Sequence, residues 1–298
     1  MDPDCYRCAR FSVDSANSDG HAARIPAKRC PRIVQQKSPD VTDPDLTGWA
    51  KPEARLRQAL DNDEFSLVCQ PILALATTGE SAGGFPLGEV LVRLREEETA
   101  MLPPGEFLPV LEHYGMMPLL DRWVVKNVAK HLAGGSRIES LTMNVSTQTL
   151  DDVEFPAYAA AQVKSAGIPA DSLVFEIEES DVLLRGDLVG RFVAAMKVVG
   201  AGVLIDGFGR KAVSFSPLKS VGAHFVKVDG SIVRKLLKSE VARTKMNAIL
   251  RVGQAIDLKV IAECVEEQDI LLQLKSLGVG FAQGFGIAPP QAMESFAR

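Results

Sequence analysis

Polar side chains break or close a series of short apolar runs along the chain. In chain order they are Glu89, Asn144, Glu176, Asp206, Lys227 with Asp229, Glu263 and Gln283. Four of the first five carry oxygen atoms of the kind that hard divalent cations select. Acidic ligands, a lysine and an amide together are what a metal-assisted phosphoryl site requires.

Each of these residues also has a simpler explanation when it is taken alone. An isolated Asp or Asn at the end of a strand is usually a helix cap or a turn former. An isolated lysine such as Lys227 more often keeps its charge at the surface. Capping gives no reason, however, for glutamates, a lysine and a glutamine to recur at the ends of seven runs. The coincidence favours one shared site.

The elements that must position these residues alternate between strands and helices. Six short runs have β character: "SLTMNVS", "LVFEIEES", "GVLIDGFG", "HFVKVDG", "KVIAECVE" and "GFAQGFG". Helical segments such as "EVARTKMNAILRVGQAID" and "EQDILLQLKSLG" separate them, which predicts parallel pairing with right-handed crossovers. With the earlier runs "FSLVCQPILAL" and "GEVLVRLRE" the strands number eight. Because no Gly-x-Gly-x-x-Gly turn follows the first strand, the pattern predicts an α/β fold of the (β/α)8 TIM-like barrel type, with its site at the C-terminal strand ends.

Composition narrows the function classes. The chain has 298 residues, a hydrophobic content of 46% and a net charge of -5. It can therefore bury a large core, and it lacks the basic footprint that a nucleic-acid polymer demands. No apolar stretch reaches the roughly 20 residues needed to span a bilayer, so we expect a cytoplasmic protein. Cys69 and Cys264 lie in apolar runs and are expected to be reduced thiols.

The N-terminal residues differ in composition from the rest. Residues 1–56, rich in Asp, Ser, Pro, Lys and Arg, are predicted to be a disordered leader, and residues 57–298 to form the barrel domain. Within the leader, four residues could form a tetrahedral zinc site: Cys5, Cys8, His21 and Cys30. Only the first pair has the usual Cys-x-x-Cys spacing, so free cysteines in a disordered arm are the favoured interpretation.

A set of motifs in order along residues 57–298 resembles the EAL-domain family of bacterial barrels, which bind and hydrolyse cyclic di-GMP. The motifs are "GEVLVR", "NVS", "EIEES", "IDGFG", "KVDGSIV", "AECVE" and "AQGFGIAPP", together with "CQPI" and "LLDRW". The activity implied by the resemblance is opening of one phosphodiester of the ring to give the linear dinucleotide pGpG, with Mg or Mn as cofactor.

The resemblance also implies a role for individual residues. The first metal ion would be held by Glu89, Asn144, Glu176 and Asp206. Lys227 and Glu263 would position and activate the attacking water, and Glu179 would brace the loop after Asp206. The dinucleotide would contact Gln70, Leu91, Arg93, Asp121, Asp229, Glu266 and Gln283, with Arg93 near a phosphate and Asp121 near a guanine edge.

The chain departs from the family pattern directly after Asp206. Active members carry a second consecutive aspartate, a ligand of a second metal ion, where this chain has Gly207. One Mg or Mn site is therefore implied and a second is in doubt. Arg210 and Lys211 replace small residues and could oppose cations, pair with phosphate oxygens or be solvated loop charges. Cys264 stands where a glycine is usual.

Three functional hypotheses follow. The first is a receptor that binds cyclic di-GMP, reports it to an unidentified protein partner and has weak or lost phosphodiesterase activity. Arg93, Asp121 and Gln283 favour binding, whereas Gly207 disfavours turnover. The alternative is an active metal-dependent phosphodiesterase, and the third hypothesis is an adaptor that binds no nucleotide. The resemblance also implies that two copies pair as a homodimer through the face near the Asp206 loop.

Overall fold

The computed structural model describes residues 49–75, 84–95, 101–210, 215, 218 and 221–298. The candidate zinc residues Cys5, Cys8, His21 and Cys30, most of the predicted leader, and Lys211 lie outside these residues. The chain divides into two compact units. The first contains the residues up to Glu64 and Leu94–Tyr114, and the second contains Phe65–Arg93 and Gly115–Arg298.

The first unit is mainly helical. Its elements are α2 (Pro52–Asp61), α3 (Pro104–His113) and the short strand β3 (Met101–Leu102), which pairs antiparallel with the end of β2 (Leu87–Arg95). Leu56 of α2 and Phe107 of α3 are fully buried, as the three- and four-residue spacing of apolar side chains predicts. The predicted boundary between residues 56 and 57 falls inside α2.

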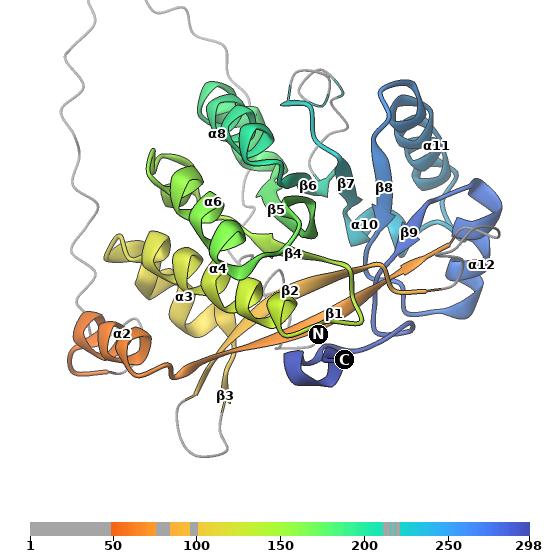
Figure 1. Cartoon of the computed structure of the whole chain (residues 1–298). Helices are drawn as coiled ribbons and strands as arrows, with labels where there is room; N and C mark the ends of the chain where they lie inside the picture. The colour runs from red at the N-terminus through yellow and green to blue at the C-terminus, as the bar shows by residue number, and fades with distance from the viewer. Residues whose placement is uncertain (1–48, 76–83, 96–100, 211–214, 216–217, 219–220) are drawn as a thin grey trace, which may run out of the picture. The chain divides into compact units, whose positions relative to one another are not determined.

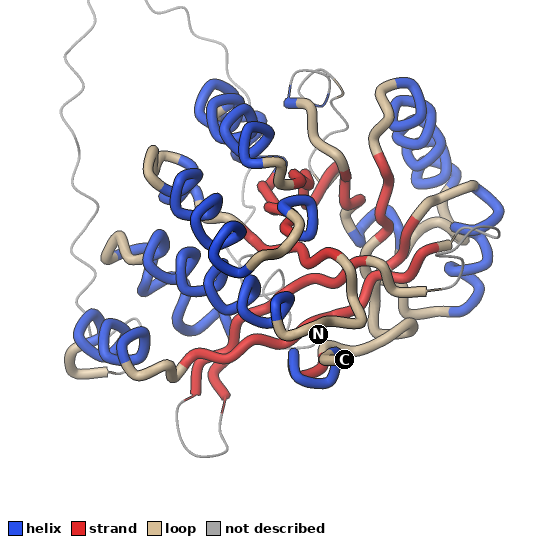
Figure 2. The backbone as a smooth tube through the Cα atoms, in the orientation of Figure 1, coloured by secondary structure: helices blue, strands red, loops and turns tan. Residues whose placement is uncertain are grey.

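The second unit is an eight-stranded barrel, which confirms the predicted fold class. In spatial order its strands are β1, β9, β8, β7, β6, β5, β4 and β2, and pairing of β1 with β2 closes the ring. Besides β2 they are β1 (Phe65–Ala74), β4 (Ser140–Asn144), β5 (Leu173–Glu178), β6 (Gly202–Phe208), β7 (Phe225–Val228), β8 (Lys259–Ala262) and β9 (Phe281–Ala282). Figure 2 shows these strands inside and helices outside.

The direction of β1 corrects one part of the prediction. From β2 round to β9 every described pairing is parallel. Strand β1 instead pairs antiparallel with β9, with Leu73 opposite Ala282. The parallel pairing predicted for the six strands from β4 to β9 is confirmed, whereas β1 departs from the eight parallel strands of an ordinary (β/α)8 barrel. An antiparallel neighbour needs no helical crossover, and residues 75–86 are all that joins β1 to β2.

Helices cover the outside of the barrel (Figure 1). The long ones are α4 (Met117–Ala133), α6 (Phe155–Ala166), α8 (Gly186–Val199), α11 (Glu240–Ala255) and α12 (Gln268–Leu277). Phe155 of α6, Phe175 of β5 and Phe192 of α8 pack together with ring centroids 5.8 to 6.1 Å apart. Three short helices follow strands directly: α5 (Thr147–Leu150), α7 (Glu179–Leu184) and α10 (Gly230–Val233). Near the C-terminus, β10 (Gln291–Ala292) pairs antiparallel with β1.

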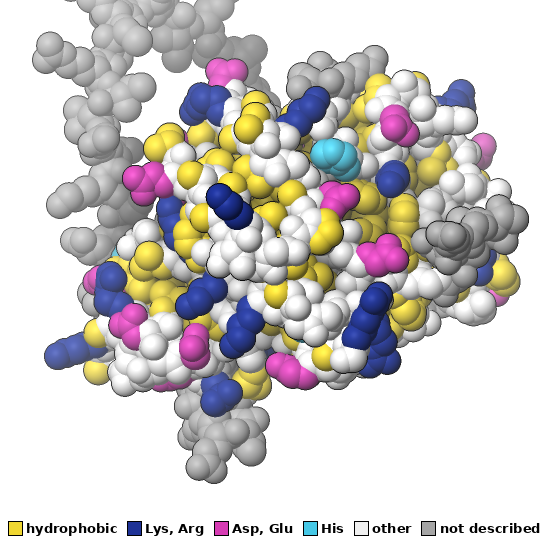
Figure 3. Space-filling view, in the orientation of Figure 1, with side chains coloured by type: hydrophobic (Ala, Val, Ile, Leu, Met, Phe, Trp, Pro, Cys, Tyr) yellow, Lys and Arg dark blue, Asp and Glu magenta, His cyan; other side chains and the backbone are white. Residues whose placement is uncertain are grey.

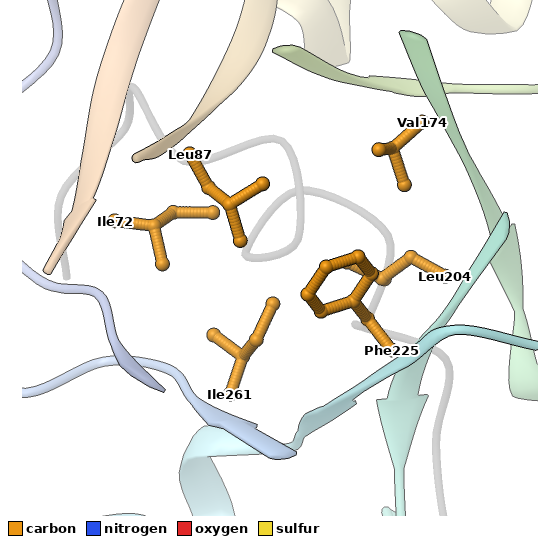
Figure 4. Packing of buried hydrophobic residues seen from close by; sticks show 6 residues of the cluster. All are labelled: Ile72, Leu87, Val174, Leu204, Phe225 and Ile261. Atoms are coloured by element: carbon orange, nitrogen blue, oxygen red, sulfur yellow. The ribbon is translucent and has the colours of Figure 1, made fainter. Parts of the chain in front are cut away.

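Apolar side chains fill one layer of the barrel interior, each from a different strand (Figure 4). They are Ile72, Leu87, Val174, Leu204, Phe225 and Ile261. Each is at most 9% exposed. This layer closes the barrel interior and supports the polar residues next to it.

The surface is of mixed charge. On the face shown in Figure 3, Lys and Arg side chains of the described residues are interspersed with Asp and Glu. Among the helices that the structure describes, none has both the length and the apolar character that crossing a bilayer requires.

Candidate active site

The predicted site residues share the barrel interior with the apolar layer. Glu89, Glu176, Asp206, Lys227 and Glu263 each follow a residue of that layer by two positions in sequence. Because side chains at i and i+2 of a strand point to the same face, this spacing carries the five charged groups inward. Four of them lie in or just beyond the C-terminal halves of their strands, whereas Glu89 is the third residue of β2 and lies opposite Thr142 of β4. All five are buried, with at most 9% of the residue exposed.

Lys227 lies at the centre of these acidic groups. Its ammonium is 2.8 and 2.9 Å from the two carboxylate oxygens of Glu176 and 2.9 Å from Oε2 of Glu89. Oδ1 of Asp206 is 3.9 Å away. The lysine is fully buried, and a buried ammonium is tolerated only beside compensating charge. The carboxylates and the lysine therefore depend on one another.

Amide and hydroxyl groups also donate hydrogen bonds to the carboxylates of Glu89 and Glu176. Gln283 Nε2 donates to Glu89 Oε2 at 2.7 Å and to Gln70 Oε1 at 3.1 Å. Asn144 Nδ2 is 3.4 Å from Glu89 Oε1. The Thr142 hydroxyl donates to Glu176, a contact that the sequence analysis missed. The signal was present, because Thr142 precedes Asn144 by two positions and so shares its face of β4.

The donor set suits a divalent cation in kind, since it consists of carboxylate and amide oxygens. Gln283 Oε1 is a buried acceptor that receives no hydrogen bond from the described residues. As they stand, however, no three or more acidic, histidine or cysteine side chains of the described residues are arranged to hold a metal ion. The ammonium of Lys227 takes the central place, so a divalent cation would compete with it for Glu89 and Glu176.

A second cluster surrounds the start of α10. Asp229 caps this helix, because its Oδ1 accepts a hydrogen bond from Ser231 N at 2.9 Å, and its Oδ2 pairs with Arg210 Nε at 2.7 Å. Burial opposes ionisation of Asp229, but the hydrogen bonds from Ser231 and Arg210 outweigh it and lower the pKa of the carboxyl. Glu263 Oε1 accepts from Gly230 N at 2.9 Å. Asp229 is therefore a helix cap, and its other carboxylate oxygen forms an ion pair with the guanidinium of Arg210.

Gly207 lies in an irregular part of β6. The register between β6 and β7 shifts between Ile205 and Phe208, and Gly207 has a φ of +68°. That left-handed conformation is uncommon for residues with a side chain, although Asp and Asn tolerate it better than most. A Cβ atom at position 207 would lie 3.2 Å from Arg210 Nη2. The guanidinium therefore fills the space into which a side chain at this position would project.

Asp121 stands apart from these clusters, on α4. Its Oδ2 accepts from the backbone N–H of Ser146 at 3.0 Å and from the Ser146 hydroxyl at 2.8 Å. Burial raises the pKa of Asp121 to about 6, although hydrogen bonds from Thr149 and Ser146 act in the opposite direction. Ser146 lies in the motif "NVS", but its contact with Asp121 was not predicted; it also caps α5. A serine before a helical segment was the available signal.

The other predicted residues occupy varied environments. Glu179 Oε1 accepts from Gly209 N at 3.1 Å, in the segment after Asp206. Arg93 is buried, and its Nη1 donates to Val92 O at 3.0 Å. Leu91 is half-buried and Glu266 is exposed. A Cβ atom at Gly286 would lie 2.4 Å from the Glu266 carbonyl, so the loop after β9 passes directly against the loop after β8.

Fold and site together define an α/β barrel with a buried carboxylate–lysine cluster at the C-terminal strand ends. Residues 53–290 match the model of the EAL domain, and the chain belongs to the EAL-domain family. It is 28% identical over 242 residues to the cyclic di-GMP phosphodiesterase PdeF of Escherichia coli, covering 80% of this chain and 32% of PdeF. It is 30% identical over 254 residues to the cyclic di-GMP phosphodiesterase NbdA of Pseudomonas aeruginosa, covering 83% of this chain and 32% of NbdA.

Solved structures are similar over the same region. The EAL domain of FimX from Pseudomonas aeruginosa bound to c-di-GMP superposes with a TM-score of 0.74 at 27% identity, covering 82% of this chain and 98% of that domain. The PaMucR phosphodiesterase in its c-di-GMP complex gives a TM-score of 0.74 at 25% identity, covering 82% and 99% of the two chains. The chain spans about a third of the length of the curated relatives PdeF and NbdA.

Proposed function

We propose that this chain binds cyclic di-GMP at the C-terminal ends of the barrel strands and acts as a signalling receptor with weak or lost phosphodiesterase activity. Family membership and the likeness to two structures that hold c-di-GMP support binding. The observation that carries the loss of activity is the environment of Gly207, where a metal-binding aspartate is absent and a guanidinium fills the adjoining space.

Recognition rests on groups of matching chemistry. Each phosphodiester of the ligand carries one negative charge, which the guanidinium of Arg93 can pair with. A guanine edge presents adjacent N–H donors, which an ionised Asp121 carboxylate can accept. Because the pKa of Asp121 is about 6, the carboxylate is mostly ionised at neutral pH. Gln283 and Gln70, already joined by a hydrogen bond, offer further amide groups.

Glu89, Asn144, Glu176 and Asp206 would hold Mg or Mn. When bound, such an ion lowers the pKa of a water molecule and stabilises charge on the phosphoryl group. In hydrolysis a water oxygen bonds to phosphorus while the bond to the 3′-oxygen breaks, and that oxygen gains a proton. Glu263 can accept the proton of the water, and Lys227 can orient the water. Position 207 lacks the aspartate that would bind a second metal ion. This loss weakens activation of the water more than it weakens binding of the dinucleotide.

An active phosphodiesterase is the second candidate, and one observation favours it. The four predicted ligands of the first metal ion and both predicted catalytic groups come from six different segments, and most of them are joined by hydrogen bonds or ion pairs. A single well-held ion would then support slow turnover.

As a receptor, the chain would pass its signal to a protein partner, with two copies pairing near the Asp206 loop.

Calorimetry and product analysis on the same preparation separate these functions. We expect cyclic di-GMP to bind with micromolar or better affinity, and micromolar protein with Mn to form no pGpG over several hours. Steady Mn-dependent formation of pGpG would establish the phosphodiesterase instead. Absence of binding with Mn and with EDTA would favour the adaptor.

A matched pair of arginine variants tests the position of the site. Arg93→Ala removes the proposed phosphate contact and should weaken binding at least tenfold. Arg251→Ala removes an exposed arginine on α11 and should leave the affinity unchanged. Equal affinities for the two variants would place the ligand elsewhere.

A further inference from the structure

Arg210 is held in a defined place by the turn that precedes it. Its backbone N–H donates to Gly207 O at 3.4 Å, and Gly209 N in the same turn donates to Glu179 Oε1 at 3.1 Å. Gly207 and Gly209 both have positive φ angles, of +68° and +83°. These conformations fold the chain back on itself, so that the side chain of Arg210 returns over Gly207.

The guanidinium of Arg210 lies between position 207 and Asp229. Its Nε is 2.7 Å from Asp229 Oδ2, while Nη2 and Cζ are 3.2 and 3.5 Å from the place that a Cβ atom of residue 207 would take. Asp229 is itself fixed as the cap of α10. The side chain of Arg210 is 30% exposed and that of Asp229 only 9%. The guanidinium thus bridges a buried carboxylate to the accessible side of the site.

This placement changes the charge at the strand ends. An aspartate at position 207 would add a negative charge to those of Asp206 and Asp229. The chain has no charge at that position and a positive charge beside it. A second divalent cation there would lack one ligand and would be repelled by the guanidinium. A guanidinium has five N–H donors in a planar fork, which matches the oxygens of a phosphate.

We propose that Arg210 takes the place of the second divalent cation. Its guanidinium neutralises Asp229 and donates through Nη atoms to a phosphate oxygen of the bound dinucleotide. The chain accordingly holds at most one divalent cation and binds cyclic di-GMP in the absence of metal. A guanidinium cannot activate water as a metal ion does, so the exchange keeps binding and loses hydrolysis. The phosphate part of this inference rests on the proposed function, whereas the cation part does not.

Counting bound Mn²⁺ without nucleotide, by electron paramagnetic resonance, tests the cation part. We expect at most one ion per chain in the wild type and no additional ion in Gly207→Asp, because the new carboxylate pairs with Arg210. The double variant Gly207→Asp with Arg210→Ala should bind one ion more than the wild type. Two ions in the wild type, or an additional ion in Gly207→Asp alone, would overturn the proposal. An unchanged count in the double variant would do the same.

Calorimetric titration with cyclic di-GMP in EDTA tests the phosphate part. The wild type should bind, Arg210→Ala should lose at least tenfold in affinity, and Arg210→Lys should lose less because it keeps the charge but not the fork. Arg251→Ala is the control and should bind as the wild type does. Equal binding by Arg210→Ala and the wild type in EDTA would overturn the inference, as would wild-type binding that requires Mn. Absence of wild-type binding under both conditions would contradict the proposed function, while the Mn²⁺ count would still decide the cation part.

Discussion

The two layers of the barrel interior come from the same strands but have opposite chemistry. In the apolar layer, Leu204 and Phe225 are buried against other apolar side chains. Two positions further along the same two strands, Asp206 and Lys227 are buried among charges. Apolar burial lowers the free energy roughly in proportion to the area removed from water. Burial of a charge lowers it only when a partner is present.

The layers differ in how strongly each side chain depends on its neighbours. Removing a side chain from the apolar layer costs its burial and leaves a cavity, but it leaves no charge without a partner. Removing Lys227 leaves Glu89 and Glu176 buried beside each other without their cation. The polar layer should therefore respond to a single substitution, and to added cations, in ways that the apolar layer does not.

The largest effect should come from Lys227→Met. Breaking a buried ion pair by removing one partner destabilises a protein by about 3 to 5 kcal/mol, and we expect a loss in this range in the free energy of unfolding. Millimolar Mg²⁺ or Mn²⁺ should restore part of it, because a divalent cation can neutralise the carboxylates that Lys227 leaves behind. Urea unfolding with and without the metal measures both effects.

Leu204→Ala is the matched control in the apolar layer. It should cost roughly 2 to 5 kcal/mol through lost burial and a residual cavity, and divalent cations should restore nothing beyond their effect on the wild type. Equal responses of Leu204→Ala and Lys227→Met to the metal would show that Lys227 does not occupy a cation site.

A smaller effect should appear at Asp121 and depend on pH. The folded protein retains the proton of Asp121 up to a pKa of about 6, whereas the ordinary value is 3.8. The contribution of Asp121 to the free energy of unfolding is therefore complete below pH 3.8, and it is lost as the pH rises through the folded-state pKa of about 6. Asp121→Asn cannot ionise, and its amide oxygen can still accept the Ser146 hydrogen bonds. Its stability relative to the wild type should rise by up to about 3 kcal/mol between pH 4 and pH 7.

Urea unfolding of the wild type and Asp121→Asn at several pH values measures this difference. Asp171→Asn, at an exposed carboxylate, is the control and should show no comparable trend. A constant difference between Asp121→Asn and the wild type across the range would contradict the raised pKa.

The smallest effect should be a gain in stability at Cys264. This residue has a φ of +58°, the left-handed conformation that glycine adopts without strain. Cys264→Gly should raise the free energy of unfolding by roughly 0.5 to 1 kcal/mol in thermal or urea unfolding. Cys69→Gly makes the same change at a fully buried strand position and should destabilise the protein. A loss of stability in Cys264→Gly would mean that the contacts of its sulfur with Gly230 and Arg234 outweigh the strain.

The sequence predicted the barrel and the polar layer because both depend on local spacing. Alternating strands and helices indicated the fold, and an inward side chain two positions after another is dictated by the strand itself. The order of polar and apolar residues along β1 also indicates its reversed direction. In the parallel strands the apolar residue precedes the polar one, as in Leu87 and Glu89, whereas in β1 the polar Gln70 precedes Ile72.

Hydrogen bonds between distant segments could not be read in this way. The contact of Asp121 with Ser146 joins α4 to the start of α5, and its raised pKa follows from burial that only packing creates. Spacing along a single element carries no information about such partners.

The sequence by itself determined that an acidic, lysine-containing site ends the strands and that position 207 lacks a carboxylate. The sequence left three roles open for Arg210: it could oppose cations, pair with phosphate oxygens or be a solvated loop charge. The tertiary structure decided its position, because the Gly207–Arg210 turn and the cap of α10 bring Arg210 and Asp229 together across 19 positions of sequence. Such a contact depends on two loops meeting at the end of the barrel, which only the closed arrangement of strands provides.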